Sequence, residues 1–555
     1  MKQLSGLDNV FLELERGNVY MHVAGLGIYD PSTAPGGKVR FKQILNFFTD
    51  RLDQARVFRR RLVVPPLAID RPYWVDDGEL DVEYHVRHIA LPHPGDWRQL
   101  MIQTARIHAR PLDRNKPLWE VYVIEGLDNI PGIAPGSFAL YIKFHHAAVD
   151  GEAGAQIIKA IHSPTPESSA GIEHKPLVAD RDPTRIEFYA RAIGHHARQA
   201  VDAAKLAAQL GTRVALAGKD MIETGKAMEL AMSLLEKRLS KAMAGDAVAA
   251  AGSLRKPSSR FDGKVSAHRV VDAVGFSMAE CKTIREHVAD ITINDIFLAA
   301  TGGGVRRYLE AKGELPAQSL VAMMPISTRG AVKDMEAGNQ IGFAPVRVRS
   351  DIADPIERLI AVHGGAARSK SASAKIGADL PAKIVNLIPA FAAARLLSKA
   401  NAAANNMTVS NVRGPDMPLY MAGAKLQVFL PVSIPFDGMG INVTGFSYDG
   451  ILWVCYVACR AMVPDPAFLT QCLKESFDEM VAAAKAHGRA ATAPKAKAVA
   501  VRKTKAAPVK AASRKAAAST KAKAATPART KAGARAAAKP AARRAAKPKP
   551  AAARA

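Results

Sequence analysis

Cysteine is scarce in this chain of 555 residues. Its four cysteines, Cys281, Cys455, Cys459 and Cys472, are too few and too scattered for a disulfide framework. Cys455 and Cys459 cannot complete a tetrahedral zinc site without two further ligands. We therefore expect buried thiols, and the cysteine pattern gives no sign of an oxidising compartment.

Long apolar runs and an N-terminal targeting segment are absent as well. Residues 1–5 lack the charged start and apolar core of a signal peptide. No stretch reaches the roughly 18 consecutive apolar residues that a membrane-spanning helix needs. The sequence therefore predicts a cytoplasmic protein that is at most peripheral to the inner face of a membrane or to lipid inclusions.

Acidic residues are missing from one region, residues 489–555. These 67 residues contain 20 Lys and Arg, 30 alanines, six prolines and no aromatic residue. They carry most of the net charge of +26 and leave +6 for residues 1–488. Such a composition buries too little apolar area to offset the entropy lost on ordering. We therefore predict a disordered basic tail over residues 488–555.

Three interpretations of that tail are open. It is a solubilising segment, a ligand of nucleic acid through the phosphates, or a ligand of anionic lipid head groups. The lack of aromatic residues argues against stacking on single-stranded bases. We favour attachment to an anionic surface, with lipid and nucleic acid both left open.

The rest of the chain divides into two α/β halves, residues 1–165 and 260–487. A connector rich in Ala, Leu, Met and Lys joins them over residues 166–259, with helical periodicity. The expected helices cover residues 41–53, 152–161 and 293–308, and the expected strands cover residues 119–124, 137–144, 320–325 and 451–458.

The most informative segment is His145-His146-Ala147-Ala148-Val149-Asp150-Gly151. It follows an expected strand and precedes an expected helix, which gives a catalytic side chain a rigid mount. Imidazole titrates near neutrality, so a neutral histidine can take a proton from a hydroxyl or thiol that attacks a carbonyl. Asp150 has the spacing to fold back on the loop, and Gly151 tolerates turn conformations that other residues resist.

A purely structural histidine pair is the alternative. The chain contains its own comparison, because His195-His196 lies in a helical stretch with no Asp-Gly after it, and we assign that pair no role. We expect no metal at the first pair, because neighbouring side chains seldom point at one ion. Gly302-Gly303-Gly304 lies within an expected helix, so we interpret it as a close packing contact and not as a phosphate loop.

Further short motifs accompany the histidines in order along the chain. They are Leu4-Ser5-Gly6-Leu7-Asp8, Met21-His22-Val23, Phe58-Arg59-Arg60-Arg61-Leu62, Pro111-Leu112-Asp113-Arg114, Pro117-Leu118-Trp119-Glu120, Asn294-Asp295, Pro325-Ile326-Ser327-Thr328-Arg329, Gly338-Asn339 and Ser410-Asn411-Val412-Arg413-Gly414-Pro415. The histidine heptad is the signature of CoA-dependent acyltransferases. With the ordered motifs, residues 1–485 resemble the bacterial wax ester synthase/diacylglycerol acyltransferase family. One departure is Phe261-Asp262-Gly263, where the family usually has Phe-Asn.

The resemblance implies two chloramphenicol-acetyltransferase-like halves, each a mixed sheet flanked by helices. It places the active site in a tunnel between them, with His146 near the middle. The implied substrates are acyl-CoA as co-substrate and either diacylglycerol or a long-chain alcohol as acceptor, with no other cofactor. Two alternatives stay open: another hydroxyl or amine acceptor on the same fold, and a non-catalytic tether between lipid droplets and nucleic acid.

The same resemblance makes His146 the general base, and we expect His145 to support the loop and the pocket shape. For Asp150 we expect a structural salt bridge with an arginine from elsewhere, Arg329 being one candidate. Asn294 either caps its helix or donates a hydrogen bond at the reaction centre.

Two further segments complete these expectations. We expect Pro117-Leu118-Trp119 to pack behind the histidine loop. Residues 380–400, apolar with three basic residues, form either a core helix or an amphipathic face that rests on a membrane or lipid droplet.

Overall fold

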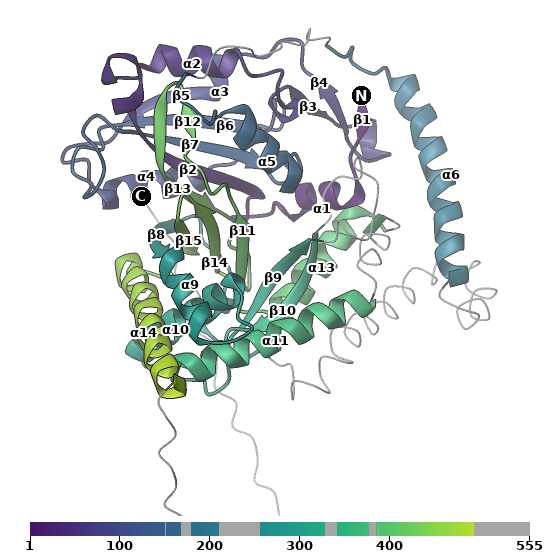
Figure 1. Ribbon diagram of the computed structural model, residues 1–555. Helices are drawn as coiled ribbons and strands as arrows, with labels where there is room; N and C mark the ends of the chain where they lie inside the picture. The colour runs from purple at the N-terminus through teal and green to yellow at the C-terminus, as the bar shows by residue number, and fades with distance from the viewer. Residues whose placement is uncertain are drawn as a thin grey trace, which may run out of the picture. The chain divides into compact units, whose positions relative to one another are not determined.

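Two mixed six-stranded β-sheets organise this computed structural model. It describes residues 1–149, 151–167, 179–209, 256–327, 341–376, 385–386 and 388–492. Figure 1 shows the first sheet drawn mostly in purple and blue and the second in teal and green. The α/β class with mixed sheets, which we expected from the sequence, is confirmed.

The first sheet has the strand order β12-β13-β2-β7-β6-β5. Only β5 and β6 run parallel, and every other neighbouring pair is antiparallel. Its strands are β2 (His22–Asp30), β5 (Val86–Ala90), β6 (Trp119–Glu125), β7 (Phe138–His145), β12 (Tyr420–Met421) and β13 (Ala424–Val432).

The second sheet has the order β10-β9-β11-β14-β15-β8, with β11 parallel to both of its neighbours. Its strands are β8 (Arg269–Ser277), β9 (Val321–Ser327), β10 (Ile341–Arg347), β11 (Met407–Arg413), β14 (Ile441–Tyr448) and β15 (Ile451–Cys459). A small third sheet joins β1 (Lys2–Gln3), β4 (Tyr73–Asp76) and β3 (Arg60–Val63).

Helices flank these sheets. In the N-terminal part they are α1 (Gly6–Leu14), α2 (Phe41–Thr49), α3 (Val82–His85), α4 (Trp97–His108), α5 (Gly151–Ala160) and α6 (Arg185–Gln209). In the C-terminal part they are α9 (Met278–His287), α10 (Ile293–Ala311), α11 (Pro355–Ile376), α13 (Ala390–Ala404) and α14 (Pro466–Thr492). The helices expected over residues 41–53, 152–161 and 293–308 are therefore confirmed as α2, α5 and α10, and the expected strands as β6, β7, β9 and β15.

Residues 420–432 correct the expected division into halves. They follow residue 260 in sequence, yet β13 pairs with β2 of the first sheet, with Leu430 opposite Leu26. In Figure 1 the green strands β12 and β13 accordingly lie beside the purple β2. The strand alternates between buried and half-buried residues, a pattern that fits either sheet, so the sequence could not tell which one it joins.

The tail boundary also needs a correction, because α14 continues to Thr492, past the expected limit at residue 488. The expected disordered tail otherwise falls on residues 493–555, outside the described residues. The connector of residues 166–259 is helical over α6, and its residues 168–178 and 210–255 are outside the described residues as well.

The two sheets share an apolar core at α4. Leu100 and Met101 of this helix are buried together with Tyr141 of the first sheet and with Val271 and Val457 of the second. Trp97 begins α4, and its indole N–H donates to Asp272 Oδ1 on β8 at 2.8 Å. This packing holds the two sheets together.

Glycines let α10 pack closely against its neighbours, as we expected for Gly302-Gly303-Gly304. A Cβ at Gly302 would meet the carbonyl oxygen of Val348 at 1.8 Å, and one at Gly304 would meet the Leu473 backbone at 2.9 Å. The prediction of a packing contact is therefore confirmed. All four cysteines are buried free thiols, which is also as expected.

Candidate active site

The loop that carries His146 is fixed by backbone hydrogen bonds to both neighbouring segments. β7 ends at His145, whose N–H donates to the carbonyl oxygen of Leu118 at 3.0 Å. The His146 N–H donates to the carbonyl oxygen of Met21 at 2.6 Å, and the Ala148 N–H closes a turn onto the His145 carbonyl at 2.9 Å. The position of His146 is therefore set by the sheet and not by a free loop.

The side chain of His145 is a second anchor of this loop. Its Nδ1 accepts a hydrogen bond from the Ala147 N–H at 3.1 Å. A neutral imidazole that accepts at Nδ1 carries its proton at Nε2, and this atom lies 3.3 Å from Oε1 of Glu15. The ring is 1% exposed. These contacts are those of a residue that supports the loop.

Glu15 joins several parts of the loop, although sequence reasoning did not select it. Its Oε1 accepts the Met21 N–H at 2.8 Å, and its Oε2 lies 2.7 Å from Nη2 of Arg114. Burial by itself would raise the pKa of Glu15. Side-chain hydrogen bonds from His145 and Arg114, electrostatic attraction from His145 and the backbone hydrogen bond from Met21 outweigh burial and lower the pKa to about 2. Glu15 therefore stays ionised and holds both His145 and the segment that receives the His146 N–H.

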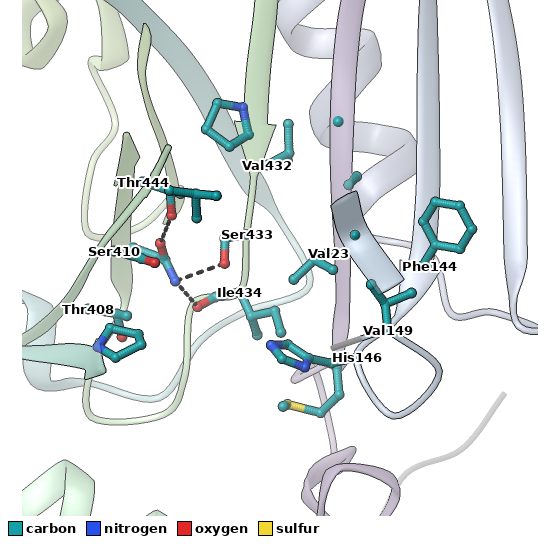
Figure 2. Close-up of a pocket in the computed structure, with 18 of the residues that line it drawn as sticks. Val23, Phe144, His146, Val149, Thr408, Ser410, Val432, Ser433, Ile434 and Thr444 are labelled. Atoms are coloured by element: carbon teal, nitrogen blue, oxygen red, sulfur yellow. Dashed lines mark hydrogen bonds between the residues drawn. The ribbon is translucent and has the colours of Figure 1, made fainter. Parts of the chain in front are cut away.

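The side chain of His146 faces a cavity of about 640 Å³. Its ring packs on Phe11, with 4.5 Å between the ring centroids. Figure 2 shows the His146 ring and Ile434 facing the same space, with Val23, Val149 and Phe144 along the neighbouring wall. Residues from both sheets line this cavity, so it lies between them.

Most of the cavity wall is apolar, and a cluster of polar groups lies where β14 of the second sheet meets the segment after β13. Asn442 donates from Nδ2 to Ser433 Oγ at 3.2 Å and to the Ile434 carbonyl at 3.0 Å. Its Oδ1 accepts the hydroxyl of Thr444 at 2.8 Å. Figure 2 shows these bonds as dashed lines, with Thr408 on the neighbouring strand. An apolar wall with a few polar groups is typical of a site for a lipid-like ligand.

His108 connects the first half to this polar wall. Its Nε2 donates to the carbonyl oxygen of Ser433 at 2.8 Å, and its Nδ1 accepts the hydroxyl proton of Tyr141 at 2.7 Å. Burial lowers the pKa of His108 to about 3, so the ring is neutral near pH 7. The link spans the two parts of the chain and had no signal in the sequence, because His108 and Ser433 are far apart along it.

Other expected residues are placed as follows. Gly151 begins α5, while Asp150 and Arg329 lie outside the described residues. The capping interpretation of Asn294 was wrong: Thr292 is the N-cap of α10, with Asp295 as its capping-box partner. The side-chain amide of Asn294 instead donates to Sδ of Met324 at 3.7 Å.

The Pro117-Leu118-Trp119 motif packs behind the histidine loop, as we expected. Trp119 is fully buried, its indole N–H donates to the Phe58 carbonyl at 2.9 Å, and its ring stacks on His85. The Leu118 carbonyl is the one that receives the His145 N–H. The family departure at Asp262 has a local explanation, because its carboxylate accepts from Lys256 at 2.9 Å and from Asn406 at 3.0 Å.

Two mixed sheets around a cavity, with a histidine on a fixed loop in its wall, form the arrangement that the sequence motifs led us to expect of a CoA-dependent acyltransferase. Its sequence matches the wax ester synthase/diacylglycerol acyltransferase catalytic domain over residues 4–297 and the C-terminal domain of the same family over residues 337–481. The chain therefore belongs to the wax ester synthase/diacylglycerol acyltransferase family, and the resemblance stated above is confirmed.

Two curated relatives show the same family. A Mycobacterium tuberculosis protein named as a diacylglycerol O-acyltransferase is 31% identical over 501 residues, which cover 88% of this chain and 98% of that protein. The O-acyltransferase WSD of Acinetobacter baylyi is 30% identical over 485 residues, 86% of this chain and 96% of the relative.

Solved structures agree with the fold. The wax ester synthase/diacylglycerol acyltransferase of Marinobacter aquaeolei VT8 superposes with a TM-score of 0.61 at 25% identity, over 87% of this chain and all of that one. The first condensation domain of the calcium-dependent antibiotic synthetase reaches a TM-score of 0.50 at 13% identity, over 87% of this chain and 96% of that domain. The second likeness concerns the fold alone.

Proposed function

We propose that the protein transfers a fatty acyl group from acyl-CoA to the hydroxyl of diacylglycerol or of a long-chain alcohol, with His146 as the general base. The observation that carries this proposal is the His146 ring in the wall of a large, mostly apolar cavity, on a loop fixed by Glu15 and His145. Family membership supports the same chemistry.

The proposed reaction needs no nucleophile from the protein, because the thioester is already activated. His146 takes the proton of the acceptor hydroxyl while its oxygen attacks the thioester carbonyl carbon. The tetrahedral intermediate then collapses, the carbon–sulfur bond breaks, and the protonated imidazole returns its proton to the departing CoA thiolate. We propose that no other cofactor takes part, and that Asp150 forms a structural salt bridge.

The test uses purified protein with palmitoyl-CoA and offers dioleoylglycerol and hexadecanol in parallel. Release of CoA and the ester products are followed. His146→Ala should lower kcat by about a hundred- to ten-thousandfold, the range of a lost general base. The control is His196→Ala, from the other histidine pair, which holds α6 through the Ile69 carbonyl.

Ester formation that persists in His146→Ala would contradict the assigned base. Wild-type protein that is folded yet esterifies neither alcohol would contradict the choice of acceptor. An amine or a different hydroxyl compound, or a non-catalytic tether, would then be the function to test.

We further propose that α6 rests on a lipid surface. One face of this helix packs on the protein through Phe188 and Ala192, each 5% exposed. On the other side Ile186 and Ile193 are 79% and 73% exposed, and Val201 is 52% exposed. They lie two turns apart on one side of the helix, and the exposed Ala190 and Ala197 fill the turns between them, so the five residues form an apolar stripe.

Exposed arginines lie beside the stripe, at positions 185, 191 and 198. An apolar stripe bordered by arginines matches the interface of a membrane or droplet with anionic head groups. In the segment of residues 380–400, which we considered for this role, Phe391 at the start of α13 is 55% exposed, whereas Ala393 and Ala394 are buried. In the part of the chain that the structure describes, no helix is long and apolar enough to span a bilayer.

Flotation with phosphatidylglycerol vesicles tests this surface. The double substitution Ile186→Asp and Ile193→Asp should lower the bound fraction several-fold. Ile360→Asp, which changes an isoleucine of α11 that is 52% exposed, should leave the bound fraction unchanged. Unchanged binding of the double variant would overturn the proposal. A fall in its melting temperature without altered flotation would mean that another part of the chain covers the stripe.

For the tail, residues 493–555, we propose binding to an anionic surface through its lysines and arginines, with lipid and nucleic acid both open. Retention on DNA that salt abolishes, without retention on anionic vesicles, would assign it to nucleic acid.

A further inference from the structure

Four polar side chains form a square on the second sheet, and this square faces the cavity. β11 and β14 run parallel, with Thr408 paired to Asn442 and Ser410 paired to Thr444. Residues two apart on a strand share a face, so all four point to the same side, and all four line the cavity. Figure 2 shows Thr408, Ser410 and Thr444 beyond Ile434 as seen from His146.

Within this square, one hydrogen bond joins two of the four side chains, those of Thr444 and Asn442. The hydroxyl of Thr444 donates to Oδ1 of Asn442. The Nδ2 of Asn442 donates in turn to Ser433 Oγ and to the Ile434 carbonyl. The hydroxyl of Thr408 is buried and has no hydrogen-bond partner among the described residues, and the residue is 3% exposed. A buried hydroxyl without a partner is costly, so a bound molecule with a polar atom at this place gains the missing bond.

The two acceptors of the proposed reaction differ in what they can offer to Thr408. A long-chain alcohol has one oxygen, and that oxygen must lie at His146 to react. Diacylglycerol carries two ester carbonyls a few bonds from its reacting hydroxyl, and an ester carbonyl accepts a hydrogen bond but donates none. Thr408 and Thr444 are 3% and 6% exposed and both line the cavity, so the square belongs to its inner wall.

We propose that this square binds an ester carbonyl of diacylglycerol, with the Thr408 hydroxyl as donor, and that it makes the enzyme prefer diacylglycerol to long-chain alcohols. The inference rests on the acyl transfer proposed above and adds the acceptor preference. Thr408 is a specificity residue in this account: it touches the acceptor but moves no proton of the reaction.

The experiment compares kcat/KM for dioleoylglycerol and for hexadecanol with palmitoyl-CoA as donor. Thr408→Val removes the hydroxyl and keeps the shape of the side chain. It should lower the ratio of kcat/KM for dioleoylglycerol to kcat/KM for hexadecanol roughly five- to tenfold, the effect of one lost hydrogen bond. Thr408→Ser restores the hydroxyl and should restore most of the ratio. Thr301→Val is the matched control, because its hydroxyl is buried in α10 and bonded to the Phe297 carbonyl.

The outcomes separate this proposal from the general one. A wild-type ratio in a folded Thr408→Val protein would overturn the subsite and leave the acyl transfer intact. An equal fall in kcat/KM for both acceptors, with a raised KM for palmitoyl-CoA, would mean that Thr408 binds a carbonyl of the donor's pantetheine arm. That result would also overturn the diacylglycerol subsite. Wild-type protein inactive with both acceptors would overturn the proposed function and this subsite together.

Discussion

Glu15 shows how much of this site depends on a residue with no chemical role of its own. It follows α1, accepts the Met21 N–H, lies beside the Nε2 of His145 and pairs with Arg114. None of these partners is near it in sequence except Met21. A lone glutamate after an amphipathic helix gives no pattern that could reveal such a position. His145 and His146, in contrast, were found from their own spacing and context.

Glu15→Gln should slow the reaction without removing the base. The substitution keeps the shape and removes the charge beside Arg114 and the Nε2 of His145, so the histidine loop is positioned less well. We expect kcat to fall about ten- to a hundredfold, the scale of a misplacement near 1 Å. The measurement is the steady-state rate of CoA release with dioleoylglycerol.

Glu13→Gln is the control for this variant. Glu13 lies two residues before Glu15 in the sequence and pairs with Arg16 on the surface. Equal kcat values for Glu15→Gln and wild type would show that the carboxylate charge does not position the loop.

At the scale of elements, α10 shows which features a sequence reveals. Helical spacing predicted its extent, and three adjacent glycines predicted a close contact. Which segments make the contact could not be predicted, because Val348 and Leu473 come from separate later parts of the chain. Capping was one of the two roles left open for Asn294, and that one was wrong. Thr292 and Asn294 both suit the N-cap position, and only the backbone geometry distinguishes them.

Gly302→Ala should destabilise the protein, and Gly365→Ala should not. A methyl group at Gly302 clashes with the Val348 backbone, whereas one at Gly365, in the middle of α11, meets open space. We expect the first substitution to cost about 1–3 kcal/mol through overpacking. The second should add about 0.5–1 kcal/mol, because alanine favours the helix.

Thermal or urea unfolding of both variants checks this pair. A loss of stability in both would mean that the effect arises from glycine replacement in general and not from the packing of α10.

At the scale of the molecule, buried histidines set the response to acid. Burial lowers the pKa of His162 to about 4 and that of His108 to about 3, and it also lowers the pKa values of His22 and His85. The unfolded chain takes up these protons near pH 6.5, before the folded protein does. The contribution of these neutral histidines to the free energy of unfolding is therefore complete above pH 6.5, and it is lost as the pH is lowered toward 3.

We expect the melting temperature to fall clearly between pH 7.5 and pH 5. His162→Gln removes one of the titrating groups and should make the fall smaller. His196→Gln, a substitution at an exposed position on α6, should leave the fall as in the wild type. The same fall in all three proteins would mean that other groups cause the acid sensitivity.

The sequence by itself determined the elements and the motif. Local periodicity predicted the strand before His145, the helix after Gly151 and the glycine contact of α10, because these depend on neighbouring residues. The ordered motifs identified the family, and the count of charged residues located the basic region at the C-terminal end.

Only the tertiary structure decided how distant segments combine. It placed β13 in the first sheet, brought Glu15 and Arg114 to His145, and set Thr408 beside Asn442 in the cavity wall. Each of these contacts joins residues that local spacing does not relate. These contacts form only when the chain folds and brings distant segments together. For that reason the sequence could single out His146 but could not predict which residues hold its loop or which residues face it across the cavity.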